Sequence, residues 1–150
     1  MKRILLFLLP FVLSYSQKMY GQVHFFDANV SKYGELEQVL GDKWDKFDSL
    51  IVHGPINKAD FKTIVRCATD GSMQVVNLQY AQIENNKIPN SGFVDWGWQK
   101  PGYHLGIRRI ILPDNITEFG EFAFYGLTLE TINIPSSLRK LGKNCFDENR

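Results

Sequence analysis

The sequence predicts a solenoid, in which short parallel β-strands stack in a right-handed coil with short helices beside the N-terminal coils. Two observations support this prediction. The stretch from Arg108 to Phe124 has a counterpart 22 residues later, from Glu130 to Phe146. The apolar spacing at the start of both stretches also recurs twice upstream. Self-similarity at a fixed period of about 20–50 residues is typical of repeat architectures.

The two C-terminal stretches share their apolar positions more than their identities. In the first, Ile107, Ile110 and Leu112 follow an L-x-x-L-x-L spacing, whose closing alternation suits a strand. A proline then ends the strand because it cannot donate to the ladder, and Gly120 and Gly142 are predicted to mark tight turns. The aligned pairs are Ile107 with Leu129, Ile110 with Ile132, Leu112 with Ile134, Pro113 with Pro135, Ile116 with Leu138, Phe119 with Leu141, Gly120 with Gly142 and Phe124 with Phe146. The period lies within the range of about 20–29 residues that leucine-rich repeats use.

Two weaker copies of this spacing precede the obvious pair. They are Phe47, Leu50 and Val52, and then Met73, Val76 and Leu78. We therefore predict an array of about four coils over residues 47–150, in which Leu50, Val76, Ile110 and Ile132 line up on adjacent parallel strands. A single coil buries too little to offset the entropy of ordering it, so such coils are stable only when stacked.

Helices are predicted between the first coils. Asn57 can cap a helix over 59–68, which Asp70 and Gly71 would end. Residues 31–40 form a second amphipathic pattern, and the segment 17–46 is predicted to cap the N-terminal end of the stack. The second spacing, from Val76 to Ile110, exceeds the basic period by 12 residues, an excess that we assign to the aromatic stretch "DWGWQKPGYH".

Residues 1–16 have the pattern of a secretory signal peptide. Lys2 and Arg3 precede an apolar run over 4–13, which small polar residues follow. The alternative, a membrane anchor, needs about 20 apolar residues, so we expect export and no membrane span after cleavage. Removing the leader leaves 15 basic and 16 acidic residues, a net charge of −1, which gives no indication of nucleic-acid binding.

Few residues have the arrangement that catalysis or metal binding requires. The three histidines, His24, His53 and His104, are scattered without metal-ligand spacing, and no nucleophile or phosphate-loop motif is present. We therefore predict no enzyme activity and no cofactor. Cys67 and Cys145 are interpreted as small buried hydrophobes, with a disulfide between them as the alternative.

The stretches "IILPDNITEFGEFAF" and "INIPSSLRKLGKNCF" resemble the BspA-type leucine-rich repeats of bacterial surface proteins. A looser likeness reaches upstream to about Tyr33. The resemblance implies a non-catalytic recognition protein, extracellular or on the cell surface of a bacterium. Two departures are visible: Cys145 replaces the small alanine seen at Ala123, and the chain stops at Arg150, just past a repeat's closing phenylalanine. The last coil is therefore expected to have an unpaired edge.

Two candidate surfaces follow from this register. Outward strand positions, among them Arg109, Ile111 and Asn133, form one row for a partner, and Ile51, Val75 and Ile111 would make an apolar seam; alternatively, these residues only favour strands. The aromatic loop with Trp96, Trp98 and Tyr103 is the second candidate. If it is extended, both tryptophans lie on one side, and they either pack on the coil or are offered to a ligand.

Three functions remain open from the sequence. The first is a secreted or cell-surface interaction module that recognises an extracellular protein or glycan through the strand face and the aromatic loop. The second is a structural cap or spacer of a longer repeat protein, without a ligand of its own. The third is a narrow glycan-binding module, which only the paired tryptophans support.

Overall fold

The chain folds into two packed layers of parallel strands and helices. The computed structural model describes residues 24–94, 96–98 and 104–150. Five strands form one sheet in the order β1-β2-β3-β5-β7, and three form a second in the order β4-β6-β8. The first sheet contains β1 (Phe25–Asn29), β2 (Ser49–Ile56), β3 (Val75–Ile83), β5 (Arg109–Ile111) and β7 (Thr131–Ile132). The second contains β4 (Lys87–Ile88), β6 (Glu118–Phe119) and β8 (Lys140–Leu141).

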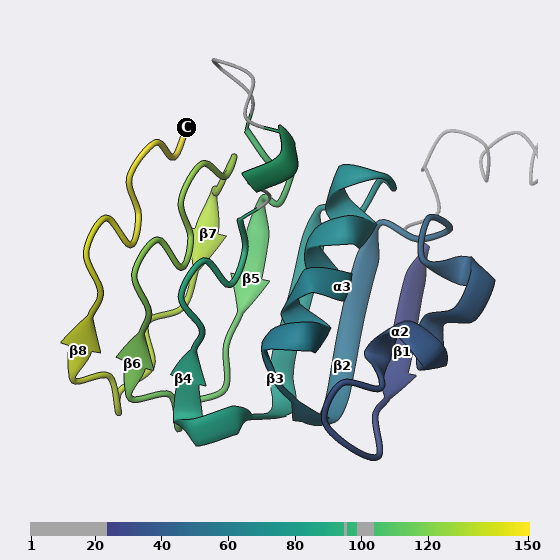
Figure 1. Cartoon of the computed structure of the whole chain (residues 1–150), viewed down its shortest axis with the longest axis horizontal. Helices are drawn as coiled ribbons and strands as arrows, with labels where there is room; N and C mark the ends of the chain where they lie inside the picture. The colour runs from purple at the N-terminus through teal and green to yellow at the C-terminus, as the bar shows by residue number, and fades with distance from the viewer. Residues whose placement is uncertain (1–23, 95, 99–103) are drawn as a thin grey trace, which may run out of the picture.

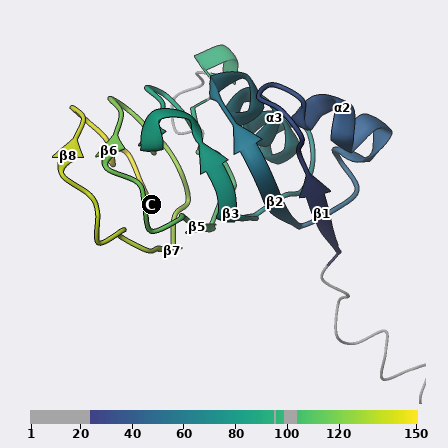
Figure 2. The same ribbon diagram turned by 90° about the horizontal axis from the view of Figure 1, so that it is seen from below.

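The helices and the short sheet share one layer of the molecule. Figure 1 shows α2 (Leu36–Leu40) and α3 (Lys58–Thr69) followed by β4, β6 and β8 along this layer. The five-stranded sheet forms the other layer, and the helices lie on one of its two faces (Figure 2). Three 3-10 turns, Gly41–Lys43, Glu84–Asn86 and Trp96–Trp98, complete the elements. The arrangement is a solenoid-like repeat fold.

The predicted strand register is confirmed. Leu50 is paired with Val76, Val76 with Ile110 and Ile110 with Ile132, on adjacent parallel strands. The prediction of four strands was one short, because β1 lies within the segment 17–46 and pairs in parallel with β2. The stack in this sheet therefore starts one strand earlier than the apolar spacing indicated.

The helix predicted after Asn57 is confirmed, and its start is fixed by a buried carboxylate. Asn57 caps α3 through a hydrogen bond from the Ala59 N–H, and Asp60 completes a capping box with the Asn57 N–H. Asp60 is 1% exposed and also accepts hydrogen bonds from the N–H groups of Gly34 (2.7 Å) and Leu36 (2.9 Å). One side chain thus joins α3 to the turn that leads into α2.

The helix predicted over residues 31–40 was too long. It begins only at Leu36, since the preceding residues form a turn. Gly34 adopts a φ of 81°, which side-chain-bearing residues rarely take, and Asp60 holds the turn in place through the Gly34 N–H. The inward side predicted for this helix is confirmed, since Leu36 and Leu40 are buried.

A column of phenylalanines passes through the centre of the stack. Phe61 of α3 meets Phe93 edge-on at 5.2 Å between ring centroids. Phe93 stacks on Phe124 at 5.4 Å, and Phe124 stacks on Phe146 at 5.1 Å. Each coil therefore contributes one ring at the same level of the stack. In the coil before β4, that ring belongs to α3.

Gly120 and Gly142 each directly precede a turn, as predicted, but neither has a positive φ, so the turn itself does not require glycine. They mark places where neighbouring coils touch. A Cβ on Gly120 would lie 2.6 Å from the backbone N of Asn90, and one on Gly142 would lie 2.3 Å from the backbone of Gly120. Glycine is needed at both positions because the backbone of the preceding coil occupies the space of a side chain.

Both cysteines are free and buried, as the sequence interpretation favoured. Burial raises the pKa of the Cys67 thiol to about 12 and that of Cys145 to about 11. The alternative of a disulfide between them is contradicted by the structure.

The last coil is open along one side. Ile134 is 60% exposed and Leu141 is 59% exposed. Their aligned partners in the preceding coil, Leu112 and Phe119, are 2% and 0% exposed. The same repeat position is thus buried where another coil follows it and exposed where none does.

Replacing one repeat position in two coils measures what stacking contributes. Leu112→Ala should lower the free energy of unfolding by about 2–5 kcal/mol, since it empties a buried site. Ile134→Ala should cost less than about 1 kcal/mol because its side chain is mostly exposed. Denaturant titration of both variants checks the difference, and equal losses would contradict the assignment of these positions.

The raised pKa values predict thiols that do not react in the native protein. At about pH 8 both groups stay protonated, and only the thiolate is nucleophilic. A disulfide-exchange reagent should therefore label neither cysteine until denaturant is added, after which both should react. Rapid labelling of either thiol in the native protein would contradict the burial.

Candidate interaction surface

The uncovered face of the five-stranded sheet presents two rows of side chains, which we call the strand face. Residues in one row are paired across neighbouring strands, so their side chains point the same way. The first row is Phe25, Ser49, Val75, Arg109 and Thr131, and the second is Asp27, Ile51, Asn77 and Ile111. All of these residues are exposed or partly exposed, whereas the alternate positions are buried or partly buried against the helices or the core.

Two of the predicted contact residues make hydrogen bonds along the strand face. The Arg109 Nε donates to the Thr131 hydroxyl at 3.2 Å. Asn133 is exposed, yet its amide is engaged with β5: its Oδ1 accepts from the Leu112 N–H at 2.7 Å, and its Nδ2 donates to the Leu112 carbonyl at 3.0 Å. Asn133 therefore extends the pairing of β5 and β7 beyond their last residues. This contact gives the Asn133 side chain a structural role.

The apolar seam predicted along the strand face is interrupted. Ile51 and Ile111 belong to the second row, where Asn77 stands between them. Val75 belongs to the first row, between Ser49 and Arg109. The prediction took one outward residue from each strand without regard to the rows, so the face is a mixture of apolar and polar groups.

A cluster at the N-terminal part of this face was missed from the sequence. The His53 Nε2 lies 3.0 Å from an Asp27 carboxylate oxygen, and the His53 ring stacks on Tyr80 with centroids 4.9 Å apart. Tyr80 is 55% exposed and Phe25 is 65% exposed. The signal was the V-x-x-F-x-A spacing that ends at Ala28, which would have placed β1 beside β2.

The aromatic loop packs against the neighbouring coil. Trp96 lies 5.8 Å from the Phe122 ring and 5.9 Å from Tyr125, while 47% of it remains exposed. Its segment is a 3-10 turn and is not extended, so the reason for predicting both tryptophans on one side was wrong. Of the other predicted loop residues, the Trp98 side chain and Tyr103 lie outside the described residues.

Part of the 12-residue excess lies outside this loop. Ile88 follows Val76 by 12 residues, whereas Phe119 follows Ile110 by 9. The longer β3 and the turn at Glu84–Asn86 account for this difference. Only the remaining nine residues belong to the stretch that contains Trp96.

The carboxylates of Asp60 and Glu118 make contacts that stabilise the fold. Asp60 is enclosed and bonded to three backbone N–H groups, which leaves its carboxylate without access to a substrate. Glu118 of β6 accepts from Lys87 at 2.7 Å and Lys140 at 3.1 Å, and these hydrogen bonds lower the pKa of its carboxyl. Within the described ranges no three His, Cys, Asp or Glu residues are grouped as metal ligands.

The stacked parallel strands and the repeated ring positions define a solenoid-like repeat protein. Residues 103–150 match the family model described as the BspA type leucine rich repeat region (6 copies). The resemblance is thereby confirmed for these residues, which are similar to BspA-type leucine-rich repeats. The family is generally non-enzymatic and suggests a protein-interaction module, typically secreted or at the surface.

Two further findings concern known proteins and membrane-spanning helices. A search of curated proteins returned no match. Among the helices that the structure describes, none combines the length and the apolar character needed to cross a membrane.

Removing the Trp96 ring tests whether it anchors its loop. Trp96→Ala should lower the free energy of unfolding by about 1–2 kcal/mol, because it loses ring contacts with Phe122 and Tyr125. Tyr33→Ala is the matched control, since Tyr33 is similarly exposed at 50%, and should cost less than about 0.5 kcal/mol. Thermal denaturation distinguishes the two, and a neutral Trp96 variant would contradict the packing role.

Proposed function

We propose that the protein is exported and recognises a protein partner through its strand face. The observation that carries this proposal is the pair of side-chain rows across five parallel strands, on the sheet face away from α2 and α3. A broad face of mixed chemistry on a rigid sheet suits a macromolecule better than a small ligand, which prefers a concave pocket.

The chemistry of the strand face favours a protein as the ligand. Phe25 on β1 and Tyr80 on β3 offer separate exposed rings, and aromatic residues contribute strongly to protein interfaces. Arg109 is exposed near the middle of the first row, and only its Nε is used within the described part of the chain. The remaining guanidinium donors are placed to meet a carboxylate or carbonyl of the partner.

The cellular setting belongs to the same proposal. Residues 1–16 are taken as a cleaved signal peptide that directs the chain to the outside or the surface of a bacterial cell. We also propose that the coil is right-handed. The partner is proposed to be an extracellular protein to which this protein adheres. A glycan ligand or a purely structural spacer would appear as a different outcome of the same binding experiments.

Charge reversal on the strand face should weaken partner binding selectively. Partners are first sought by screening the leader-free protein against immobilised extracellular-matrix proteins and a glycan array. For a protein ligand found in this way, Arg109→Glu should weaken binding by at least about tenfold, which is about 1.4 kcal/mol. Lys143→Glu changes the net charge equally at an exposed position of the last coil and should leave affinity unchanged.

Three outcomes would overturn the proposal. One is equal weakening by Arg109→Glu and Lys143→Glu, which would indicate only a general effect of net charge. Another is a fall in melting temperature of Arg109→Glu large enough to explain lost binding. The third is binding confined to glycans, or absent from all immobilised ligands.

A further inference from the structure

A groove separates α3 from residues 83–94 and Trp96, on the face opposite the strand face. It consists of two hollows of about 260 Å³ and 520 Å³. Lys58 and Phe61 line both hollows, so they form one continuous groove along the helix. At 12 residues, α3 is about 18 Å long, a length that five or six residues of extended peptide span.

The helix side of the groove carries cations without partners. Lys58 and Lys62 are exposed, and neither is paired with an acidic group in the part of the chain that the structure describes. By contrast, Arg66 is bonded to Glu37 at 2.8 Å and lies near Asp70. The other charged lining residues are Lys87, which is paired with Glu118, and Glu84.

The spacing of the two lysines suits an extended chain. Residues four apart project from one side of a helix and differ by about 6 Å along its axis. In an extended peptide, side chains on the same side recur every second residue, about 6.6–6.8 Å apart. Acidic residues at alternate positions of such a peptide would therefore meet Lys58 and Lys62 in turn.

An aromatic wall closes the other end of the groove. Trp96 is 47% exposed and lines the larger hollow together with the partly exposed Val94, whereas Phe61 and Val65 beneath them are 1% and 6% exposed. Because Phe122 and Tyr125 hold the Trp96 ring, a ligand would meet a side chain already fixed in place. An apolar side chain of the ligand fits this wall, since tryptophan contributes strongly to such contacts.

We propose that this groove binds an extended acidic segment of a protein, with acidic residues at alternate positions followed by a large apolar residue. The site is separate from the strand face and does not depend on the function proposed for it. An acidic glycan shares the charge requirement, but charge alone makes no use of the apolar surface that Trp96 and Val94 supply.

A synthetic peptide tests the groove directly. The probe is a fluorescein-labelled peptide of about nine residues, with glutamate at the first, third and fifth positions and leucine at the seventh. Fluorescence anisotropy should detect its binding, which should weaken as salt rises from about 0.05 M to about 0.5 M. The same peptide with glutamine in place of glutamate should bind at least about tenfold more weakly.

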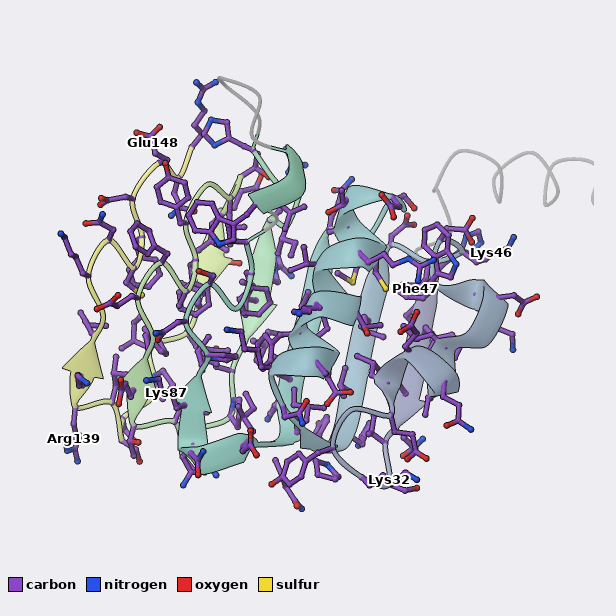
Figure 3. The ribbon with its side chains drawn as sticks, viewed as in Figure 1. Lys32, Lys46, Phe47, Lys87, Arg139 and Glu148 are labelled. Carbon is purple, nitrogen blue, oxygen red and sulfur yellow. The ribbon has the colours of Figure 1, made fainter. Side chains whose placement is uncertain are left out.

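Matched charge reversals locate the binding. Lys58→Glu combined with Lys62→Glu should weaken peptide binding by about tenfold or more. Lys58→Glu places an acidic residue in the first turn of α3, where the helix dipole favours it, so the fold should be retained. The control combines Lys32→Glu with Lys46→Glu, which makes the same change in net charge at exposed positions near α2 (Figure 3) and should leave binding unchanged.

Several results would overturn this inference. They are equal binding of the glutamine peptide, equal weakening by the control pair, and preference of the groove for a uronic-acid oligosaccharide over the peptide. Arg109→Glu should not alter peptide affinity, so loss of the strand-face function and loss of the groove function would be told apart.

Discussion

Contact between equivalent residues of successive coils is the interaction on which the structure depends. The strand register, the ring column and the close approach at Gly120 all repeat one relation, in which a residue meets its own counterpart in the next coil. Burial follows from this contact: Leu112 is enclosed because the last coil lies against it, whereas Ile134 in that coil is exposed. A solenoid shares its stability among neighbours in this way, and the stacked coils bury one continuous core.

Polar groups fix the same register where apolar packing is weaker. Glu118 binds lysines from the strands on both sides of β6, and Asn133 pairs with the backbone beyond the end of β7. At the other end of the molecule, Asp60 ties α3 to the turn before α2. Each of these polar contacts belongs to one position in one coil and is not repeated along the stack. Residues outside the shared apolar pattern can therefore differ from coil to coil.

Apolar spacing and helix capping were sufficient to predict the strand register and α3, and the wide sequence separation of Cys67 and Cys145 favoured free thiols. The first strand, β1, was not predicted because Ala28 occupies the position at which the other coils have a larger apolar residue. A turn with positive φ recurs at Ser91, Phe122 and Asn144, but these residue types share no sequence signature. The groove could not be predicted either, since it joins Lys58 to Trp96 through contacts that depend on the three-dimensional stack.

The two faces of the molecule separate the candidate functions that the sequence had combined. The outward residues of the strands lie on one face, while Trp96 lies beside α3 on the other. Both faces rely on the coils staying stacked, and amide hydrogen exchange measures this most directly. The N–H groups of Arg109, Gly120, Thr131 and Gly142 all donate to a carbonyl of the preceding coil. If stacking governs stability, those of Arg109 and Gly120, in a coil with neighbours on both sides, should exchange more slowly than those of Thr131 and Gly142 in the last coil. Equal or slower exchange in the last coil would contradict this account.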